Sequence, residues 1–144
     1  MANEKLFFVG LKALITDKKG KILLFKAETA HHRNKTPYWD IPGGRVQHGE
    51  TITQTLHREI EEETGVTDIK TTEFWTSVVS KHEIPIDEGD TLAGLVLMIY
   101  KITIPEDSNI RISPEHTEYG WFTPLEAAKL LADKYPAEFT DLLK

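Results

Sequence analysis

Apolar residues gather in short segments along the chain, and most of these segments are too short and too rich in β-branched residues for helices. Turn-forming residues bound each of them. The predicted strands are residues 6–16, 21–27, 38–41, 69–82, 91–104 and 118–122. The turn Asp17-Lys18-Lys19-Gly20 predicts that the first two form a hairpin. The segment 91–104 has the strongest β character, and we expect it to be a central strand.

Two capping boxes mark the starts of helices between and after these strands. Thr51 with Gln54 predicts a helix from Ile52 to Thr64, which Gly65 ends in a left-handed conformation. The second box is Thr123-Pro-Leu-Glu126, and it predicts a helix to about residue 133, followed by a short helix at 137–143. Strands, helix, strands and helix in this order predict an α/β (α+β) fold, with a mixed sheet covered by helices on both faces.

The first predicted helix places acidic side chains next to its apolar stripe. At 100° per residue, the stripe that should face the core contains Ile52, Leu56 and Ile60. Glu59 and Glu63 share the side of this stripe and Glu62 borders it, whereas Glu61 and His57 point to water. The plain interpretation is a solvated acidic face. However, carboxylates beside a buried stripe and near a helix C-terminus are unfavourable without a cation, and carboxylate oxygens suit Mg²⁺ or Mn²⁺.

The glycine pair before this helix and the acidic residues on it fit one longer pattern. From Gly44 to Val66 the chain reads G-x5-E-x7-R-E-U-x-E-E-x-G-U, where U is apolar. This pattern resembles the Nudix box of the Nudix hydrolases, including the MutT-like members, and every defined position is filled. Pro42-Gly43-Gly44 allows a sharp turn and a close backbone approach to a ligand.

The resemblance implies an α/β/α sandwich with a mixed sheet and the hydrolysis of a nucleoside diphosphate linked to another moiety. It implies a metal site made by Glu59, Glu62, Glu63 and a carbonyl of Gly43 or Gly44. It also implies that Arg58 orients the box carboxylates, with Glu50 as its partner, so that the expected catalytic residues are Glu50, Arg58, Glu62 and Glu63. The alternative for Arg58 is an ordinary i,i+4 pair with Glu62.

The sequence identifies the catalytic base and the substrate residues less clearly than it identifies the metal ligands. A box carboxylate or a loop acid could activate water, and the loop candidates are Glu83, Asp87, Glu88, Asp90, Glu115 and Glu118. Trp39 and Asp40 precede the glycine pair and are expected substrate residues; an aromatic there could contact a base, although a core tryptophan is an equal alternative. Arg33 and Lys35 could hold a phosphate or lie on a solvated loop. His82 and His116 are expected at the surface or at strand ends.

Composition narrows the class of protein. The chain has 144 residues, which suits one domain (1–144), and it has no cysteine, which excludes disulfides and a thiol nucleophile. A net charge of −6 makes binding to long nucleic acid unfavourable. We see neither a signal peptide nor a membrane-spanning run and expect a cytoplasmic protein. The oligomeric state stays open, with a homodimer as one option.

These observations lead to a functional hypothesis with named alternatives. We expect a metal-dependent pyrophosphate hydrolase that acts on a small nucleotide, first of all a (deoxy)nucleoside triphosphate, with ADP-ribose or a dinucleoside polyphosphate as other substrates. A domain that binds a nucleotide or ADP-ribose as a sensor is one alternative, and a prenyl diphosphate isomerase is another. The complete set of box carboxylates counts against both.

Overall fold

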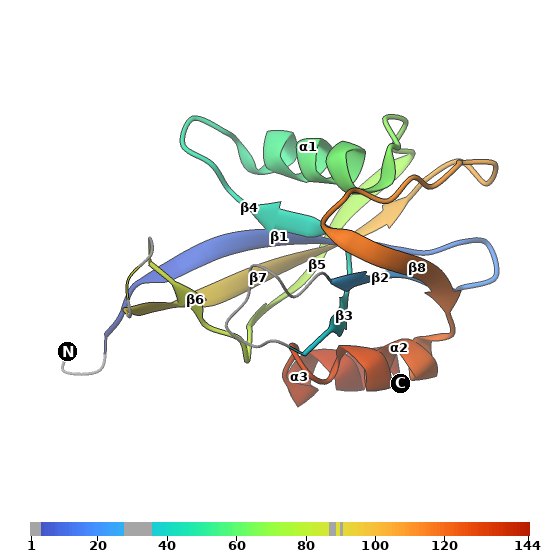
Figure 1. Cartoon of the computed structure of the whole chain (residues 1–144). Helices are drawn as coiled ribbons and strands as arrows, with labels where there is room; N and C mark the ends of the chain where they lie inside the picture. Colours follow the sequence, from blue (N-terminus) through green and yellow to red (C-terminus); the bar gives the residue numbers. More distant parts are fainter. Residues whose placement is uncertain (1–3, 28–35, 87–88, 90) are drawn as a thin grey trace.

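The computed structural model describes residues 4–27, 36–86, 89 and 91–144. Two sheets lie between helices (Figure 1). The strands of the first sheet follow the order β4-β1-β7-β5, and β6 pairs with β7; the second sheet has the order β3-β2-β8. The first-sheet strands are β1 (Phe7–Ile15), β4 (Gly43–Arg45), β5 (Thr71–Val79), β6 (Ile84–Pro85) and β7 (Leu92–Thr103). Those of the second sheet are β2 (Ile22–Ala27), β3 (Tyr38–Asp40) and β8 (His116–Phe122).

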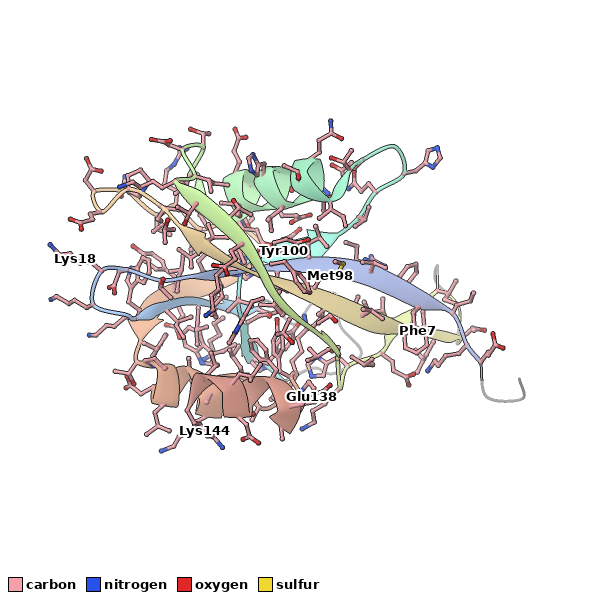
Figure 2. The ribbon with its side chains drawn as sticks, turned by 180° about the vertical axis from the view of Figure 1, so that it is seen from behind. Phe7, Lys18, Met98, Tyr100, Glu138 and Lys144 are labelled. Atoms are coloured by element: carbon pink, nitrogen blue, oxygen red, sulfur yellow. The ribbon has the colours of Figure 1, made fainter. Side chains whose placement is uncertain are left out.

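Helices cover both faces of the sheets. Helix α1 (Ile52–Thr64) lies on one face, and α2 (Pro124–Leu131), α3 (Ala137–Thr140) and the 3₁₀ turn η1 (Asp141–Leu143) lie on the other (Figure 1). Strand β1 runs parallel to β7, and the other strand pairs are antiparallel. The expected α/β/α arrangement with mixed strand directions is therefore confirmed. In the view from behind, Met98 and Tyr100 of β7 lie between the layers and Glu138 lies on the α3 side (Figure 2).

Side chains on the two faces of the strands pack into two separate apolar clusters. Leu11 and Ile15 of β1 pack with Leu56 and Ile60 under α1, whereas Leu14 packs into the cluster beneath α2 and α3. Because side chains alternate between the faces of a strand, one strand can serve both cores. The packing of α1 on its cluster then determines which of its charged side chains lie near the ends of the strands.

Helix α1 has the predicted bounds and caps, but its apolar stripe is shorter than expected. Thr51 accepts a hydrogen bond from the Gln54 backbone N–H, and Gly65 adopts φ 77°. Leu56 and Ile60 are buried, whereas Ile52 is 40% exposed. The expectation for Ile52 is therefore wrong, because the stripe reaches the core only from the second turn of the helix.

The strand pairing differs from the sequence prediction in three places. Strands β1 and β2 do not form a hairpin ladder, since a single bridge between Thr16 and Ile22 joins them before they enter different sheets. Strand β1 instead pairs along its whole length with β7. Strand β4 contains the glycine pair that suggested only a turn, and β6 lies in the predicted acidic loop. The pairings of β1 with β7 and with β4 join residues far apart in the chain and have no signal in local composition. The central position of β7 is confirmed.

Within the part of the chain that the structure describes, no helix is long and apolar enough to cross a membrane.

Candidate functional site

Helix α1 and strand β4 bring the two halves of the box together. A Cβ atom at Gly44 would lie 2.3 Å from the Glu59 carboxyl, so only glycine leaves room for this carboxylate against the strand. Gly43 has φ 151°, and a Cβ atom there would lie 1.9 Å from the Leu11 carbonyl oxygen. The two glycines therefore serve different purposes. Gly43 allows the strand pairing with β1, and Gly44 allows the approach of Glu59.

Arg58 holds three carboxylates, and we call Arg58, Glu50, Glu59 and Glu62 the Arg58 cluster. Its Nε and Nη2 donate to the two oxygens of Glu50 at 2.6 and 3.0 Å. Its Nη1 donates to Glu59 at 2.7 Å and to Glu62 at 3.2 Å. Both partners considered from the sequence, Glu50 and Glu62, are present. The bonds from Arg58 lower the pKa of Glu50 to about 2. One cation for three carboxylates leaves this cluster with an excess of negative charge.

Glu63 lies apart from the Arg58 cluster, on the buried side of α1. Its carboxylate accepts the Gly43 N–H at 3.1 Å and lies 3.5 Å from Nε2 of His116. Burial raises the pKa of Glu63 to about 8, against the opposing effects of Lys12 and of the Gly43 hydrogen bond. Burial also lowers the pKa of His116. The Glu63 carboxylate thus lacks a full counter-charge in the protein alone.

The acidic residues supply the right atoms for a divalent cation but are not arranged around one point. Among the described residues, no three Asp, Glu, His or Cys side chains form a ready group for a metal ion. Glu59 and Glu62 are turned toward Arg58, and Glu63 toward Gly43 and His116. The donor set is nevertheless all oxygen, with unbalanced negative charge, and this suits a hard cation such as Mg²⁺ or Mn²⁺. Glu61, which the helical periodicity predicted to point to water, is exposed.

Two cavities meet at the glycine pair. The first cavity has a volume of about 610 Å³ and is bordered by Glu63, His116 and the ends of several strands. The second cavity, of about 500 Å³, is bordered by Arg58, Glu59 and Glu62. The residues that line both are Gly43, Gly44, Arg45 and Glu115. The size of the first cavity is typical of small-molecule sites.

Asp40 is buried and borders the first cavity, in what we call the Asp40 cluster, made of Asp40, Lys12, Lys134 and Tyr135. Its Oδ2 accepts from Lys12 at 3.0 Å and from Lys134 at 2.6 Å, and its Oδ1 accepts from the Tyr135 hydroxyl at 2.6 Å and from the Ile41 N–H at 2.8 Å. Asp40 itself therefore has no free oxygen lone pair for a base. Asp40 stays a predicted substrate residue, and it borders the first cavity together with its partners Lys12 and Lys134.

The charges of the Asp40 cluster support one another despite burial. Burial alone would raise the pKa of Asp40, but the two ammonium groups outweigh it and hold that pKa well below its usual range. Burial opposes the charge of Lys12, and the attraction to Asp40 outweighs this effect and raises its pKa. Burial prevails for Lys134, whose pKa is lowered to about 8.

The other sequence candidates fall in different places. Trp39 packs against Phe122 with ring centroids 5.2 Å apart and borders neither cavity, so its position favours the alternative of a core tryptophan. Glu118 faces Lys26, while Glu83 and Glu115 border the first cavity. Arg33 and Lys35 lie outside the described residues, as do Asp87, Glu88 and Asp90.

Sequence reasoning missed three groups of the first cavity, namely Lys12, Lys134 and the half-buried His116. Lys12 had a usable signal, because it interrupts the apolar run Val9-Gly-Leu-Lys-Ala-Leu-Ile15 of a strand that is buried on both faces. Lys134 follows α2 in a polar turn, and nothing in its neighbours indicates burial. His116 was expected at a strand end, and it begins β8 there, but its contact with Glu63 depends on the fold.

Comparison with known proteins indicates one family. The NUDIX domain family matches residues 7–143. A MutT-like protein of Streptomyces ambofaciens is 25% identical over 141 residues, which cover 98% of this chain and 80% of that protein. The CTP pyrophosphohydrolase of Escherichia coli is 27% identical over 80% of this chain and 76% of its own length. The crystal structure of a MutT protein from Methanosarcina mazei superposes with a TM-score of 0.71 at 27% identity, and covers 97% of this chain and 92% of that one.

The box geometry, the sandwich of sheets and helices, and these similarities agree. The chain belongs to the NUDIX domain family and is a hydrolase of pyrophosphate bonds.

Proposed function

We propose that this hydrolase cleaves a pyrophosphate bond of a nucleoside triphosphate with the help of Mg²⁺ or Mn²⁺. The observation that carries the proposal is the Arg58 cluster, where one guanidinium serves three carboxylates beside the Gly44 backbone and borders the second cavity. A polyphosphate cannot approach such an acidic surface without cations between them. Nudix hydrolases generally use a divalent metal, which agrees with this requirement.

Different residues would hold the cation and orient the carboxylates that bind it. Glu59, Glu62 and Glu63, with a carbonyl of Gly43 or Gly44, would hold the cation. A bound divalent cation holds phosphate oxygens and stabilises the negative charge that develops on them. Arg58 orients Glu59 and Glu62, and the two-point contact with Glu50 fixes the plane of its guanidinium.

Of the candidate loop acids that the structure describes, Glu115 has the position that best supports a role as the base outside the box. It borders both cavities, at the junction formed by the glycine pair. Glu83 borders only the first cavity and pairs with Lys5, while Glu118 faces Lys26. A carboxylate at the junction can reach water near a phosphate that spans the two cavities.

The nucleotide assignment rests on the pair of cavities and on the relatives. An acidic cavity that suits metal and phosphates adjoins a larger cavity lined by both apolar and charged side chains, and a nucleoside triphosphate carries phosphates at one end and a base at the other. The E. coli relative is named for CTP, which supports this substrate class. The complete box favours turnover over a sensor role.

The test is a panel of nucleoside triphosphates, ADP-ribose and dinucleoside polyphosphates, with release of phosphate and pyrophosphate as the readout. Turnover should require Mg²⁺ or Mn²⁺ and vanish with EDTA. Glu62→Gln should lower kcat by on the order of a hundredfold or more, since it removes a ligand of the cation that would stabilise the charge on the reacting phosphates. Glu61→Gln is the matched control, one residue away and exposed. Full activity in EDTA, or equal losses in the two variants, would overturn the proposal.

A further inference from the structure

Lys12 and Lys134 of the Asp40 cluster lie next to the box. Lys12 is opposite Gly43 in the pairing of β1 with β4, and a Cβ atom at Gly43 would lie 2.8 Å from Cδ of Lys12. The Gly43 N–H in turn donates to the Glu63 carboxylate at 3.1 Å. Both lysines border the first cavity together with Gly43 and Glu63. They therefore lie beside the carboxylate that would help to hold the cation.

The two lysines share a single carboxylate. Both ammonium groups contact the same oxygen of Asp40, Oδ2, at 3.0 and 2.6 Å, so two like charges lie close together. The other side-chain donor to Asp40, the Tyr135 hydroxyl, is neutral because burial raises its pKa well above the usual value. One negative charge thus balances one of two positive charges. Both lysine side chains are 8% exposed, so bulk water screens the remaining charge only weakly.

Each lysine also has N–H bonds that its contacts with the described residues do not use. An ammonium group has three N–H bonds. Lys12 donates to Asp40 and, at 3.3 Å, to the Ile41 carbonyl, which accounts for two of them. Within the described part of the chain, Lys134 donates to Asp40 alone, which accounts for one. An acceptor on a ligand in the first cavity can therefore receive a charge-assisted hydrogen bond from these lysines.

The position of the lysines indicates which kind of acceptor they take. A cation held by Glu63 and a carbonyl of the glycine pair would bind phosphate oxygens at the same place. These oxygens would then lie along Gly43, the residue opposite Lys12. Phosphate oxygens are charged acceptors, and lysine binds them as a compact positive charge. A neutral acceptor would leave the excess charge of the two lysines unbalanced in a buried place, which is unfavourable.

We propose that Lys12 and Lys134 bind a non-bridging oxygen of the substrate phosphate that the cation holds at Glu63. This inference rests on the proposed function, since it takes a polyphosphate to lie at the box. It assigns a substrate-binding role to two residues outside the box, and a positioning role to Asp40, which holds both ammonium groups at one oxygen. The ligand class is a metal-bound phosphate, in a nucleoside triphosphate or in free pyrophosphate.

The first test uses inorganic pyrophosphate, which has phosphates like those of the substrate but no base. Titration calorimetry in millimolar Mg²⁺ near pH 7 measures its affinity, and at this pH Lys134, with a pKa of about 8, is protonated. Lys134→Met removes the ammonium group and keeps an unbranched side chain. The variant should bind pyrophosphate about tenfold more weakly, the effect of one hydrogen bond to a charged group. An unchanged affinity would overturn the proposal.

Two control variants separate phosphate binding from other effects of the substitution. Lys129→Met removes the same charge from an exposed position of α2, and Tyr135→Phe removes a donor to Asp40 from a residue that borders neither cavity. Both should retain the wild-type affinity to within about twofold, because exposed charges are screened and the lysines stay in place. A tenfold loss in Lys129→Met would indicate a general effect of net charge. The same loss in Tyr135→Phe would assign Lys134 to the stability of the Asp40 cluster.

A measurement on the wild type answers the question even if Lys134→Met does not fold. The Nζ resonances of Lys12 and Lys134 can be followed by NMR in the protein with Mg²⁺. Adding pyrophosphate should shift both resonances, and the Nζ resonance of the exposed Lys129 should stay in place. If pyrophosphate binds and the resonances of Lys12 and Lys134 do not move, the lysines do not contact the phosphate and the proposal fails.

Turnover of nucleoside triphosphates separates this role from the proposed function. In Lys134→Met, kcat/KM should fall about tenfold, in parallel with the affinity for pyrophosphate. Pyrophosphate binding that depends on Lys134, in a protein that hydrolyses no triphosphate, would retain the role of the lysines and remove the proposed function. Hydrolysis with an unchanged kcat/KM in Lys134→Met would do the opposite. A wild type that neither binds pyrophosphate in Mg²⁺ nor hydrolyses any triphosphate would remove both.

Discussion

The Arg58 cluster and the Asp40 cluster are built on opposite plans. In the first, one guanidinium serves three carboxylates, and in the second, one carboxylate serves two ammonium groups and a hydroxyl. The side chains also differ in exposure: Glu50, Glu59 and Glu62 are 18%, 14% and 57% exposed, and Asp40 is only 7% exposed. The first cluster therefore carries an excess of negative charge near water, and the second an excess of positive charge in the interior.

This difference shows how the same kinds of side chain serve chemistry in one place and stability in another. Charges near water interact weakly, so the Arg58 cluster can exchange partners and accept a cation at low cost. Buried charges interact strongly and leave large penalties when one partner is removed. Asp40 should therefore behave as a structural residue that fixes the lysines, and the Arg58 cluster as a site that depends on its ligand.

The largest expected effect on stability comes from Asp40→Asn. The variant keeps the shape of the side chain but leaves two buried ammonium groups without their counter-charge, which should cost about 3–5 kcal/mol of the free energy of unfolding. Glu62→Gln is the matched change in the other cluster and should cost less than about 0.5 kcal/mol, because its pair with Arg58 is half exposed. Urea denaturation measures both, and similar losses would contradict the comparison.

The next effect is stabilisation by metal. A cation that binds only the folded form raises stability by RT ln(1 + [L]/Kd), about 2.7 kcal/mol at a hundredfold excess over Kd. Millimolar Mg²⁺ or Mn²⁺ should therefore raise the melting temperature of the wild type. The increase should shrink strongly when Glu59→Gln and Glu63→Gln are combined, and persist in Glu61→Gln. An unchanged increase in the double variant would place the cation elsewhere.

Without metal, the single replacements Glu59→Gln and Glu63→Gln should have different effects on the melting temperature. Glu63 is buried without a full counter-charge, so Glu63→Gln alone should not lower the melting temperature in EDTA. Glu59 has a hydrogen bond from Arg58, so Glu59→Gln should lower it slightly. Simple repulsion among the three acids would instead make both replacements stabilising.

A smaller effect on stability, with a clear effect on activity, is expected for Gly44→Ala. The new Cβ would displace the end of the Glu59 side chain, which is flexible, so the stability loss should stay near the value of an exposed ion pair, at most about 1 kcal/mol. Turnover should fall because Glu59 no longer lies against the strand. Gly43→Ala is the contrast, since its Cβ would meet the Leu11 carbonyl and disturb the pairing of β4 with β1. Calorimetry and turnover together distinguish the two.

The smallest expected effect is a difference in how the stability contributions of the two clusters depend on pH and salt. Asp40 has a lowered pKa in the folded state, so its contribution is fully present above the unfolded value near 4 and is lost as the pH falls toward the folded value. Glu50, whose pKa is lowered to about 2, contributes in the same direction. Added salt should weaken the Glu50 part, which is near water, and leave the Asp40 part unchanged. Stability curves of Asp40→Asn and Glu50→Gln between pH 2 and 6 at two ionic strengths test this, and equal salt dependence would contradict it.

Local rules in the sequence determined helix α1 and the order of residues on it. Its capping box, its closing glycine and the 100° rotation per residue placed Glu59 and Glu63 toward the core and Glu61 in water, and the structure agrees. These features depend on neighbours within one or two turns, which is why they can be read from the chain itself. The spacing of the box likewise indicated the family before any coordinates.

Only the tertiary structure decided which distant residues meet. The pairing of β1 with β7 rather than β2, the burial of Lys134 against Asp40 at a separation of 94 residues, and the contact between His116 and Glu63 come from packing across the sandwich. Periodicity can predict that Lys12 faces a core, but the counter-charge that makes its burial tolerable lies on another strand. Charge partners far apart in the chain leave no local pattern, because the free energy that pairs them exists only once the layers have closed around them.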